Sequence, residues 1–258
     1  QPLTFLSMDN AGYAALTRLI TASYLDGQGQ GLPLVERAWL ERWNEGLIVL
    51  SGGARGDVGQ ALLNQDERLA RQRLAFWHTH FPGRYYLEVQ RTGRPGDEDH
   101  VHAAVALAGA TQTPVVASND VRFLERDDFE AHEARVCIHD GRILHDDQRP
   151  RHYAEAQYLR SPEEMAALFS DLPEALENTV AIAQRCNLSL TLGQNVLPDF
   201  PVPEGRSIEA HLRSEAKAGL ESRTAALGTP GGDPADYDAR LDHELGAIEQ
   251  MGFPGYFL

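Results

Sequence analysis

Ten histidines make a metal site the first chemistry to consider, because neutral imidazole is a common metal ligand. The closest pairs are His78/His80 and His100/His102, and both fall in segments with helical periodicity. Residues two apart on a helix point in different directions, so neither pair can share a metal ion easily. We therefore expect these four histidines at the surface or at helix edges.

Two zinc motifs also fail in this sequence. His132-Glu133 begins like H-E-x-x-H, but Val136 stands where the second histidine is required. The two cysteines, Cys137 and Cys186, lie in apolar helical patterns with no CxxC pair. They are predicted to be buried free thiols.

Two glycine-rich segments could approach an anion. Gly27–Gly31 lacks the G-x-G-x-x-G spacing and follows a helical pattern, which predicts a flexible loop. Ser51–Gly56 (SGGARG) follows an apolar strand and precedes a helix, so its free N–H groups could bind an anion, with Arg55 adding charge. A simple tight turn is the alternative, and the absence of a P-loop lysine excludes a Walker site.

Asp120 is the best single candidate for a metal ligand. It ends the apolar run Val115–Asp120 (VVASND), and chemistry in parallel α/β folds sits at the carboxyl ends of strands. Arg122, two residues on, would point to the same side if the strand continued. A carboxylate beside a guanidinium most simply forms an ion pair, which could occupy the place of a metal.

The elements that must position these residues alternate between strands and helices, which favours a parallel α/β sheet or barrel. Four strands are too few to close a barrel, so a barrel would need further strands, which we expect before Gln1. The predicted strands are Leu3–Ser7, Leu47–Ser51, Tyr85–Gln90 and Val115–Ser118. The predicted helices are Ala11–Tyr24, Val35–Trp43, Val58–His80, Glu98–Ala110, Phe129–Asp140, Ser161–Phe169, Leu172–Cys186, Ser207–Leu227 and Ala235–Met251.

Local signals mark several boundaries. Ser161-Pro162-Glu163-Glu164 has a capping serine, a proline at the first helical position and acidic residues in the first turn. Asp171-Leu-Pro-Glu predicts a second helix start of this kind. Leu197–Gly205 is rich in proline and predicts a linker, and Gly228–Pro234 predicts a flexible turn between the last two helices.

Composition limits the partners of the chain. Its 258 residues carry a net charge of −15, and only one lysine, Lys217, occurs among the basic residues. Such a surface repels phosphate backbones, and no basic stripe is visible, so we do not expect the main DNA-binding surface here. No run of about 20 apolar residues is present, so we expect no membrane span and a cytoplasmic location. The lack of an initiator Met and the apolar ending GFPGYFL predict a piece of a longer protein.

Six stretches, in order along the chain, resemble the alpha subunits of bacterial DNA polymerase III, most closely the replicative proteobacterial type. They are NEGLIVLSGGARGDVG, YYLEVQRTGRP, PVVASNDVRFL, DFEAHEARVCIHDGRIL, LPEALENTVAIAQRCNL and IEQMGFPGYFL. The resemblance implies an incomplete PHP-type distorted (β/α)7 barrel, followed by a mostly helical segment that leads into the polymerase palm. It divides the chain into residues 1–195 (PHP domain without its N-terminal strands), 196–206 (proline-rich linker) and 207–258 (helical start of the palm region).

The same resemblance implies a degenerate metal site. Metal-binding members have a histidine where this chain has Thr92, a histidine where it has Arg122, and often a cysteine where it has Gly53; Asp120 is retained. Arg122 would put a fixed positive charge among the ions, so Asp120 is expected to be a vestigial ligand without catalytic metals.

For function, the resemblance implies that the parent protein is a DNA-directed DNA polymerase that acts on DNA and nucleotides with Mg²⁺. Its catalytic aspartates are expected outside this chain, which holds no catalytic residue and no cofactor of its own. The PHP domain is expected to be a scaffold and docking site for the proofreading exonuclease subunit, beside other replicase subunits. The alternative is an active metal-dependent PHP phosphoesterase in proofreading or pyrophosphate hydrolysis; a stand-alone PHP phosphatase fits the palm-like ending less well.

Overall fold

The computed structural model describes residues 1–29, 31–194, 199–229 and 232–258. The chain forms two compact units, Gln1–Leu190 and Thr191–Leu258. The predicted linker falls partly on residues 195–198, outside the described residues, and its described part, 199–206, contains no helix or strand. The predicted turn Gly228–Pro234 likewise includes two residues, 230 and 231, that the structure does not describe.

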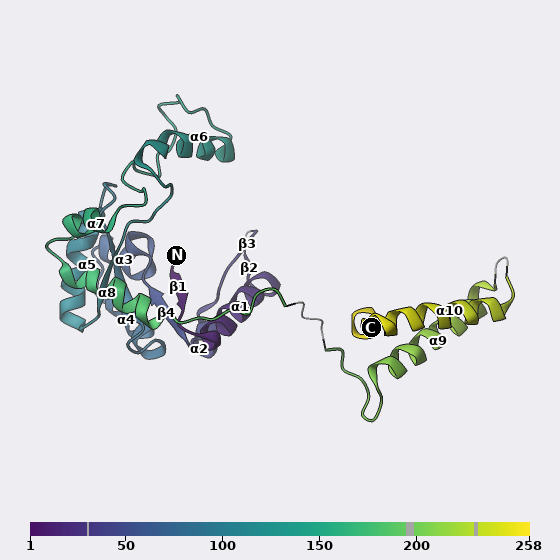
Figure 1. Ribbon diagram of the computed structural model, residues 1–258. Helices are drawn as coiled ribbons and strands as arrows, with labels where there is room; N and C mark the ends of the chain where they lie inside the picture. Colours follow the sequence, from purple (N-terminus) through teal and green to yellow (C-terminus); the bar gives the residue numbers. More distant parts are fainter. Residues whose placement is uncertain (30, 195–198, 230–231) are drawn as a thin grey trace. The chain divides into compact units, whose positions relative to one another are not determined.

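All four predicted strands are present and form one sheet in the first unit (Figure 1). The sheet order is β1-β4-β5-β6, with β1 at Thr4–Ser7, β4 at Leu47–Leu50, β5 at Tyr85–Gln90 and β6 at Val115–Ser118. Strands β4, β5 and β6 run parallel, as predicted, with Leu87 beside Val115 in the register. These apolar runs form buried strands because both faces of the sheet are covered.

Strand β1 differs from the prediction because it pairs antiparallel with β4, with Thr4 opposite Leu50. The connection between them contains the two predicted helices, α1 (Asn10–Leu25) and α2 (Arg37–Arg42). It returns the chain to the end where β1 finishes, and the N–H of Met8 donates to the carbonyl of Gly46 at 2.8 Å. The chain must then run back along β1, which makes the pair antiparallel.

The helices match the predicted segments with one exception, since the predicted helix Val58–His80 is two helices, α3 and α4. Gln65 between them has a φ of +57°, and the Asp66 carboxylate caps α4 by accepting from the N–H of Leu69 at 2.8 Å. The remaining helices of the first unit are η1 (Gly53–Arg55), α3 (Asp57–Leu63), α4 (Glu67–His80), α5 (Asp97–Thr111), η2 (Arg126–Asp128), α6 (Phe129–Asp140), α7 (Pro162–Leu168) and α8 (Pro173–Arg185).

Two local predictions are corrected. The segment predicted as a flexible loop contains strand β2 (Gln28–Gly29), which pairs antiparallel with β3 (Leu32–Pro33). The predicted cap Asp171 does not cap α8; its carboxylate binds the guanidinium of Arg91 at 2.5 Å instead. That hydrogen-bonded ion pair lowers the pKa of Asp171 to about 2.

The predicted Ser161 cap of α7 is confirmed. Ser161 and Glu164 form a full capping box.

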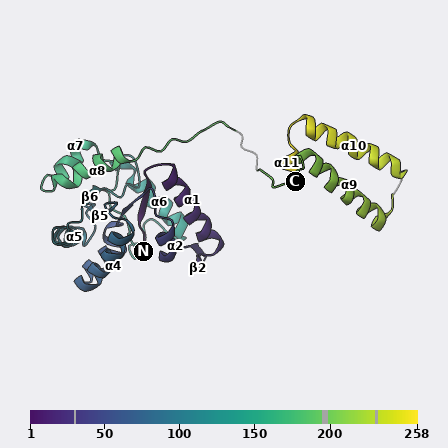
Figure 2. The same cartoon turned by 90° about the horizontal axis from the view of Figure 1, so that it is seen from below.

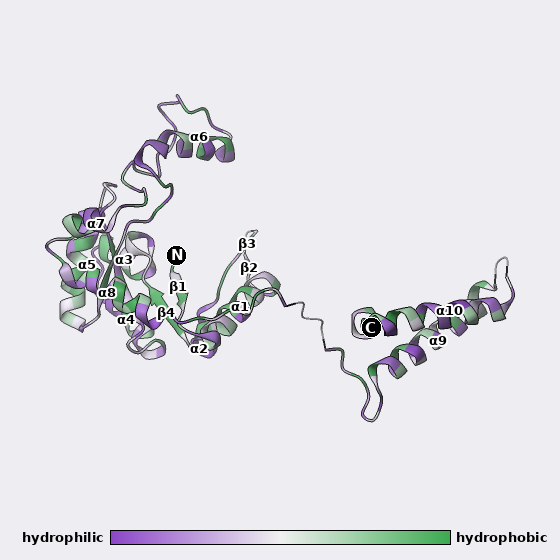
Figure 3. Ribbon diagram, in the orientation of Figure 1, coloured by the Kyte–Doolittle hydropathy of each residue, from purple (hydrophilic) through white to green (hydrophobic). Residues whose placement is uncertain are grey.

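Helices lie on both sides of the sheet (Figure 2), and β4 is one of its hydrophobic segments (Figure 3). The core has clusters on both faces. On one face, Leu47 and Leu87 pack with α1, α3 and α4, including the fully buried Trp77 and Phe81. On the other face, a smaller cluster packs against Ile182 of α8 and consists of Ile48, Tyr86 and Val116.

The second unit is a helical hairpin of α9 (Ile208–Leu227) and α10 (Pro234–Gln250), followed by α11 (Pro254–Phe257). The Arg213 guanidinium on α9 makes two hydrogen bonds to the Glu249 carboxylate on α10, at 2.6 and 2.8 Å. Leu212 and Leu245 are the buried apolar residues of the two long helices. No helix in the described part of the chain is both long and apolar enough to cross a membrane.

His100 corrects the expectation of surface histidines. It lies on α5 with 2% of its surface exposed and faces Gly59 of α3, whereas His102, two residues on, is exposed. This contrast is what helical geometry predicts for residues two apart. Burial lowers the pKa of His100 from 6.5 to about 4, partly opposed by the nearby carboxylate of Asp97.

This burial predicts acid sensitivity. The folded pKa is below the unfolded one, so the unfolded chain takes up the proton first as the pH falls through 6.5. Stability should be complete above pH 6.5 and decrease by up to roughly 3 kcal/mol towards pH 4. Urea unfolding between pH 4 and 8 would measure this loss. His100→Gln should flatten the curve, His102→Gln should not, and an unchanged curve in both variants would contradict the assignment.

Candidate functional site at the carboxyl edge of the sheet

One face of the sheet changes from apolar to polar at the carboxyl ends of β5 and β6. On β5 the side chains of this face are Tyr86, Glu88 and then Gln90, and on β6 they are Val116 and then Ser118. Because side chains alternate along a strand, these residues share one face. Parallel strands place their carboxyl ends together, so the polar side chains meet at one edge.

Glu88 is the centre of the first cluster and is only 6% exposed. Its carboxylate accepts hydrogen bonds from the Ser118 hydroxyl, the Gln90 amide at 3.2 Å and the backbone N–H of Gly52 at 3.1 Å. All three donors are uncharged. A buried carboxylate needs such donors because burial otherwise penalises its charge heavily.

Asp120 is the centre of the second cluster, and its carboxylate forms ion pairs with arginine side chains. Its carboxylate accepts from the guanidinium of Arg122 at 2.6 Å, of Arg94 at 2.9 Å and of Arg55 at 3.4 Å. The Gln157 amide adds a fourth donor at 2.9 Å. The predicted proximity of Asp120 and Arg122 is therefore confirmed, and two further arginines join them.

Arg94 connects the other predicted positions to Asp120. Its Nε donates to the hydroxyl of Thr92 at 2.8 Å, and its Nη2 donates to the side-chain oxygen of Gln90 at 3.1 Å. A Cβ added to Gly53 would lie 3.0 Å from that same Gln90 oxygen. Thr92, Gly53, Arg122 and Asp120 thus converge, although they lie in three separate loops.

The SGGARG segment (Ser51–Gly56) is a tight turn, and its backbone binds the carboxylate of Glu88. Gly52 and Gly53 have φ values of +76° and +58°, which favour glycine, and a Cβ on Gly56 would lie 1.6 Å from the Ser51 carbonyl oxygen. The N–H of Gly52 is directed at the Glu88 carboxylate. Of the two alternatives left open by the sequence, the turn geometry is observed.

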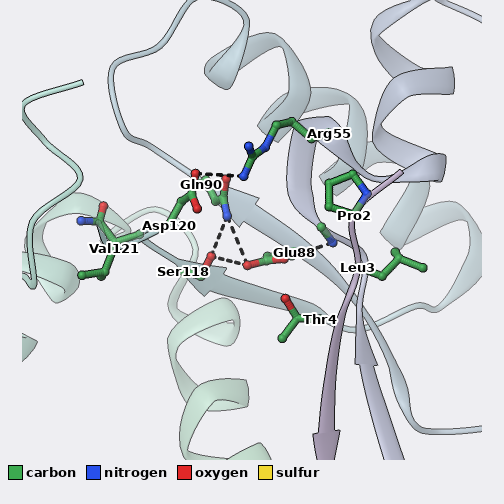
Figure 4. Close-up of a pocket in the computed structure, with 11 residues that line it drawn as sticks. Pro2, Leu3, Thr4, Arg55, Glu88, Gln90, Ser118, Asp120 and Val121 are labelled. Atoms are coloured by element: carbon green, nitrogen blue, oxygen red, sulfur yellow. Dashed lines mark hydrogen bonds and ion pairs between the residues drawn. The ribbon is translucent and has the colours of Figure 1, made fainter. Parts of the chain in front are cut away.

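The two carboxylates line a pocket of about 320 Å³ (Figure 4). Pro2, Leu3 and Thr4 form one wall beside Glu88, while Arg55 and Asp120 lie on the opposite side in the close-up. Arg55 is half-exposed and supplies the positive charge on that side.

The side chains present do not fit a catalytic metal centre. Nowhere in the described ranges do three or more His, Cys, Asp or Glu residues come close enough to hold an ion. The Asp120 oxygens are already bound by guanidinium groups, which carry fixed positive charge and have no lone pair to give a metal.

Sequence reasoning missed Glu88, Arg94 and Gln157. Glu88 had a visible signal, because it is the only carboxylate in the otherwise apolar and amide strand YYLEVQ. Gln157 had none, since it lies 37 residues after Asp120 and meets it only through the fold.

Two sequence comparisons relate this chain to known proteins. The model of the PHP domain family matches residues 1–92, which include β1, β4, β5 and the SGGARG turn. The chain is 52% identical to the DNA polymerase III subunit alpha of Pseudomonas aeruginosa, over 99% of this chain and 22% of that protein. The corresponding subunits of Escherichia coli K12 and Vibrio cholerae are 52% and 48% identical, over the same shares.

The first 92 residues are therefore similar in sequence to the PHP domain family. More specifically, the chain is homologous along nearly its whole length to one segment of the DNA polymerase III alpha subunit family. It spans about a fifth (22%) of the length of these curated relatives.

Removing the Asp120 carboxylate should destabilise the first unit. Asp120→Ala would leave the guanidinium groups of Arg94 and Arg122 close together with no counter-charge, at a cost of roughly 2–4 kcal/mol. Amide hydrogen exchange should accelerate in residues 121–158, whose ends are joined at Asp120 through Gln157. Chemical unfolding and exchange mass spectrometry would measure both effects.

Asp171→Asn is the matched control, because it removes an exposed partner of Arg91 and should cost less than about 1 kcal/mol. Equal stability of Asp120→Ala and the wild type would show that the arginine cluster is not a structural element.

Proposed function

We propose that this chain is the PHP-containing part of a replicative DNA polymerase III alpha subunit, and that the whole protein performs template-directed DNA synthesis in the cytoplasm. The single observation that carries the proposal is the 52% identity that extends over 99% of the chain. On this proposal, residues 207–258 lead into the palm, and the aspartates that bind Mg²⁺ for nucleotidyl transfer belong to other segments of the protein.

The sheet would be one part of a distorted seven-strand barrel in the whole protein, spanning residues 1–195 and the strands that precede them. The parallel order β4-β5-β6 and the polar carboxyl edge support this architecture. The proline-containing segment 196–206 would connect this domain to the palm region.

The PHP domain itself would be a scaffold without catalytic metals. Asp120 would be the retained ligand position, with Gly53, Thr92 and Arg122 the lost ones. The ion pairs of Asp120 support this role, because Arg94 and Arg122 supply the positive charge that metal ions would otherwise bring. A guanidinium cannot activate water, so the cluster would hold the loops together and perform no hydrolysis.

An active phosphoesterase is the second candidate. It is favoured by one observation: two carboxylates, Glu88 and Asp120, line the same polar pocket at the carboxyl edge. It requires metal ions at a place where three arginines already bind one of these carboxylates.

Elemental analysis of the full-length protein distinguishes the two candidates. We expect no stoichiometric Zn²⁺ or Mn²⁺ in the wild type and none in Thr92→His/Arg122→His, because Arg94 would still bind Asp120. Adding Arg94→Ala should allow metal binding, measurable by calorimetric titration with Zn²⁺. Two or three ions per wild-type chain would overturn the scaffold role in favour of hydrolysis.

In the assembled replicase, the domain would dock the proofreading exonuclease subunit beside other replicase subunits. The net charge of −15 supports a protein partner over direct binding of DNA by this segment, because like charges repel the phosphate backbone.

A further inference from the structure

An arm, formed by residues 121–158, leaves the sheet directly after Asp120 and carries α6 at its far end (Figure 1). The two roots of the arm are joined beside the sheet. The N–H of Arg122 donates to the Gln157 carbonyl at 2.8 Å, and the Asn119 amide donates to the carbonyls of Ala156 and Tyr158, both at 2.8 Å. The arm is therefore fixed at its base.

The arm also has a small core of its own. His132 on α6 lies with its ring 5.4 Å from that of Phe123 and 4.6 Å from that of Tyr153. Glu133 and Arg149 form a buried ion pair at 2.5 Å. One face of α6 is thus used inside the arm, and the opposite face is left outside.

That outward face combines apolar and positive side chains. Ile138 is 82% exposed, and Ile143, just past the helix, is 74% exposed. Arg135 and Arg142 are both exposed. Arg135 lies three residues before Ile138 on α6, so helical spacing puts these two side chains near the same face. Arg142 follows Gly141, which ends the helix with a φ of +63°. The N–H of Arg142 still bonds to the Cys137 carbonyl at 2.8 Å, which keeps the chain close to the helix end.

The acidic residues of α6 avoid this face, although the chain is strongly acidic. At about 100° per residue, Glu130 lies about 80° from Ile138 around the helix, and Glu133 and Asp140 lie on the far side. The ion pairs of the arm use other arginines, namely Arg122 with Asp120, Arg126 with Glu155 and Arg149 with Glu133. An apolar centre flanked by cations fits an apolar side chain flanked by carboxylates.

We propose that Arg135 and Ile138 on α6, together with Arg142 and Ile143 just past the helix, form the docking surface for an acidic protein segment that inserts an apolar side chain between its carboxylates. The inference rests on the docking role proposed above and identifies that partner segment with one of the exonuclease subunit. The exposed isoleucines favour a protein over a phosphate backbone, because nucleic acid offers no apolar side chain to cover them.

The test is a binding titration between the full-length alpha subunit and the purified exonuclease subunit from the same organism. Ile138→Asp and Arg135→Glu should each raise the Kd at least tenfold, and the Arg135 effect should shrink at high salt. Two matched controls, Ile20→Asp on α1 and Arg68→Glu on α4, change exposed residues elsewhere and should stay within twofold. Thermal melts of each variant check that the fold is retained.

The outcomes are separable. If wild-type protein does not bind the exonuclease subunit, the docking role itself fails. If it binds and the α6 variants bind equally well, the docking role stands and the α6 surface is wrong. Competition by duplex DNA for the same residues would assign the face to phosphate. Self-association that Ile138→Asp abolishes, without an effect on exonuclease binding, would assign it to a second copy of the chain.

Discussion

The Asp120 carboxylate accepts hydrogen bonds from three guanidinium groups that come from three different places in the chain. Arg55 belongs to the turn after β4, Arg94 to the loop after β5, and Arg122 to the segment after β6. Asp120 itself has a φ of +42°, an uncommon value for a residue other than glycine, although aspartate adopts it more readily than most side chains. Local strain of this kind persists when surrounding contacts determine the conformation, and here four side-chain donors do so. The loop ends of the sheet are thereby joined at one carboxylate.

Both carboxylates at the carboxyl edge of the sheet, Glu88 and Asp120, therefore have hydrogen-bond donors. Glu88 is satisfied by uncharged donors and Asp120 by cations, and Gln90 joins the two clusters through its amide nitrogen and oxygen. The amide can do so because it carries both donors and an acceptor. The alternation of strand side chains places Glu88 and Gln90 on one face of the sheet, while the loops after the strands supply Asp120 and its arginines.

The sequence was sufficient for features that depend on short-range patterns. The four strands could be predicted because each is a short apolar run, and the Ser161 cap because its hydrogen-bonding chemistry lies within four residues. The break at Gln65 was missed because no proline or glycine marks it; it depends on the positive φ of Gln65 and on the cap that Asp66 provides. The direction of β1 depends on how a long connection returns, and the burial of His100 depends on which face of α5 meets α3. Neither of these is encoded in neighbouring residues.

The contacts of the candidate site also separate into those that the sequence predicts and those that depend on the fold. The pair Asp120 and Arg122 was predictable because two residues separate them, whereas the role of Gln157 depends on the return of the whole arm to the sheet. The resemblance singles out Thr92 as a position where a histidine ligand is expected, but the partners of Thr92 could not be predicted. Its N–H and hydroxyl bind the Asp97 carboxylate, both at 2.7 Å, and its hydroxyl accepts from Arg94. These contacts depend on the path of the loop after β5, which the residue type at position 92 does not determine.

A guanidinium in place of a metal ion changes the chemistry of the edge in a definite direction. Both neutralise carboxylates, but a metal ion offers open coordination positions and lowers the pKa of bound water, while a guanidinium offers only directional donors. On the proposed scaffold role, the arginines around Asp120 would therefore keep an electrostatic link between the strand-end loops without a means of activating a nucleophile. The hydrogen bonds of Gln157 to Asp120 fix the base of the arm in the same place, and such a fixed base supports a scaffold rather than a hydrolase.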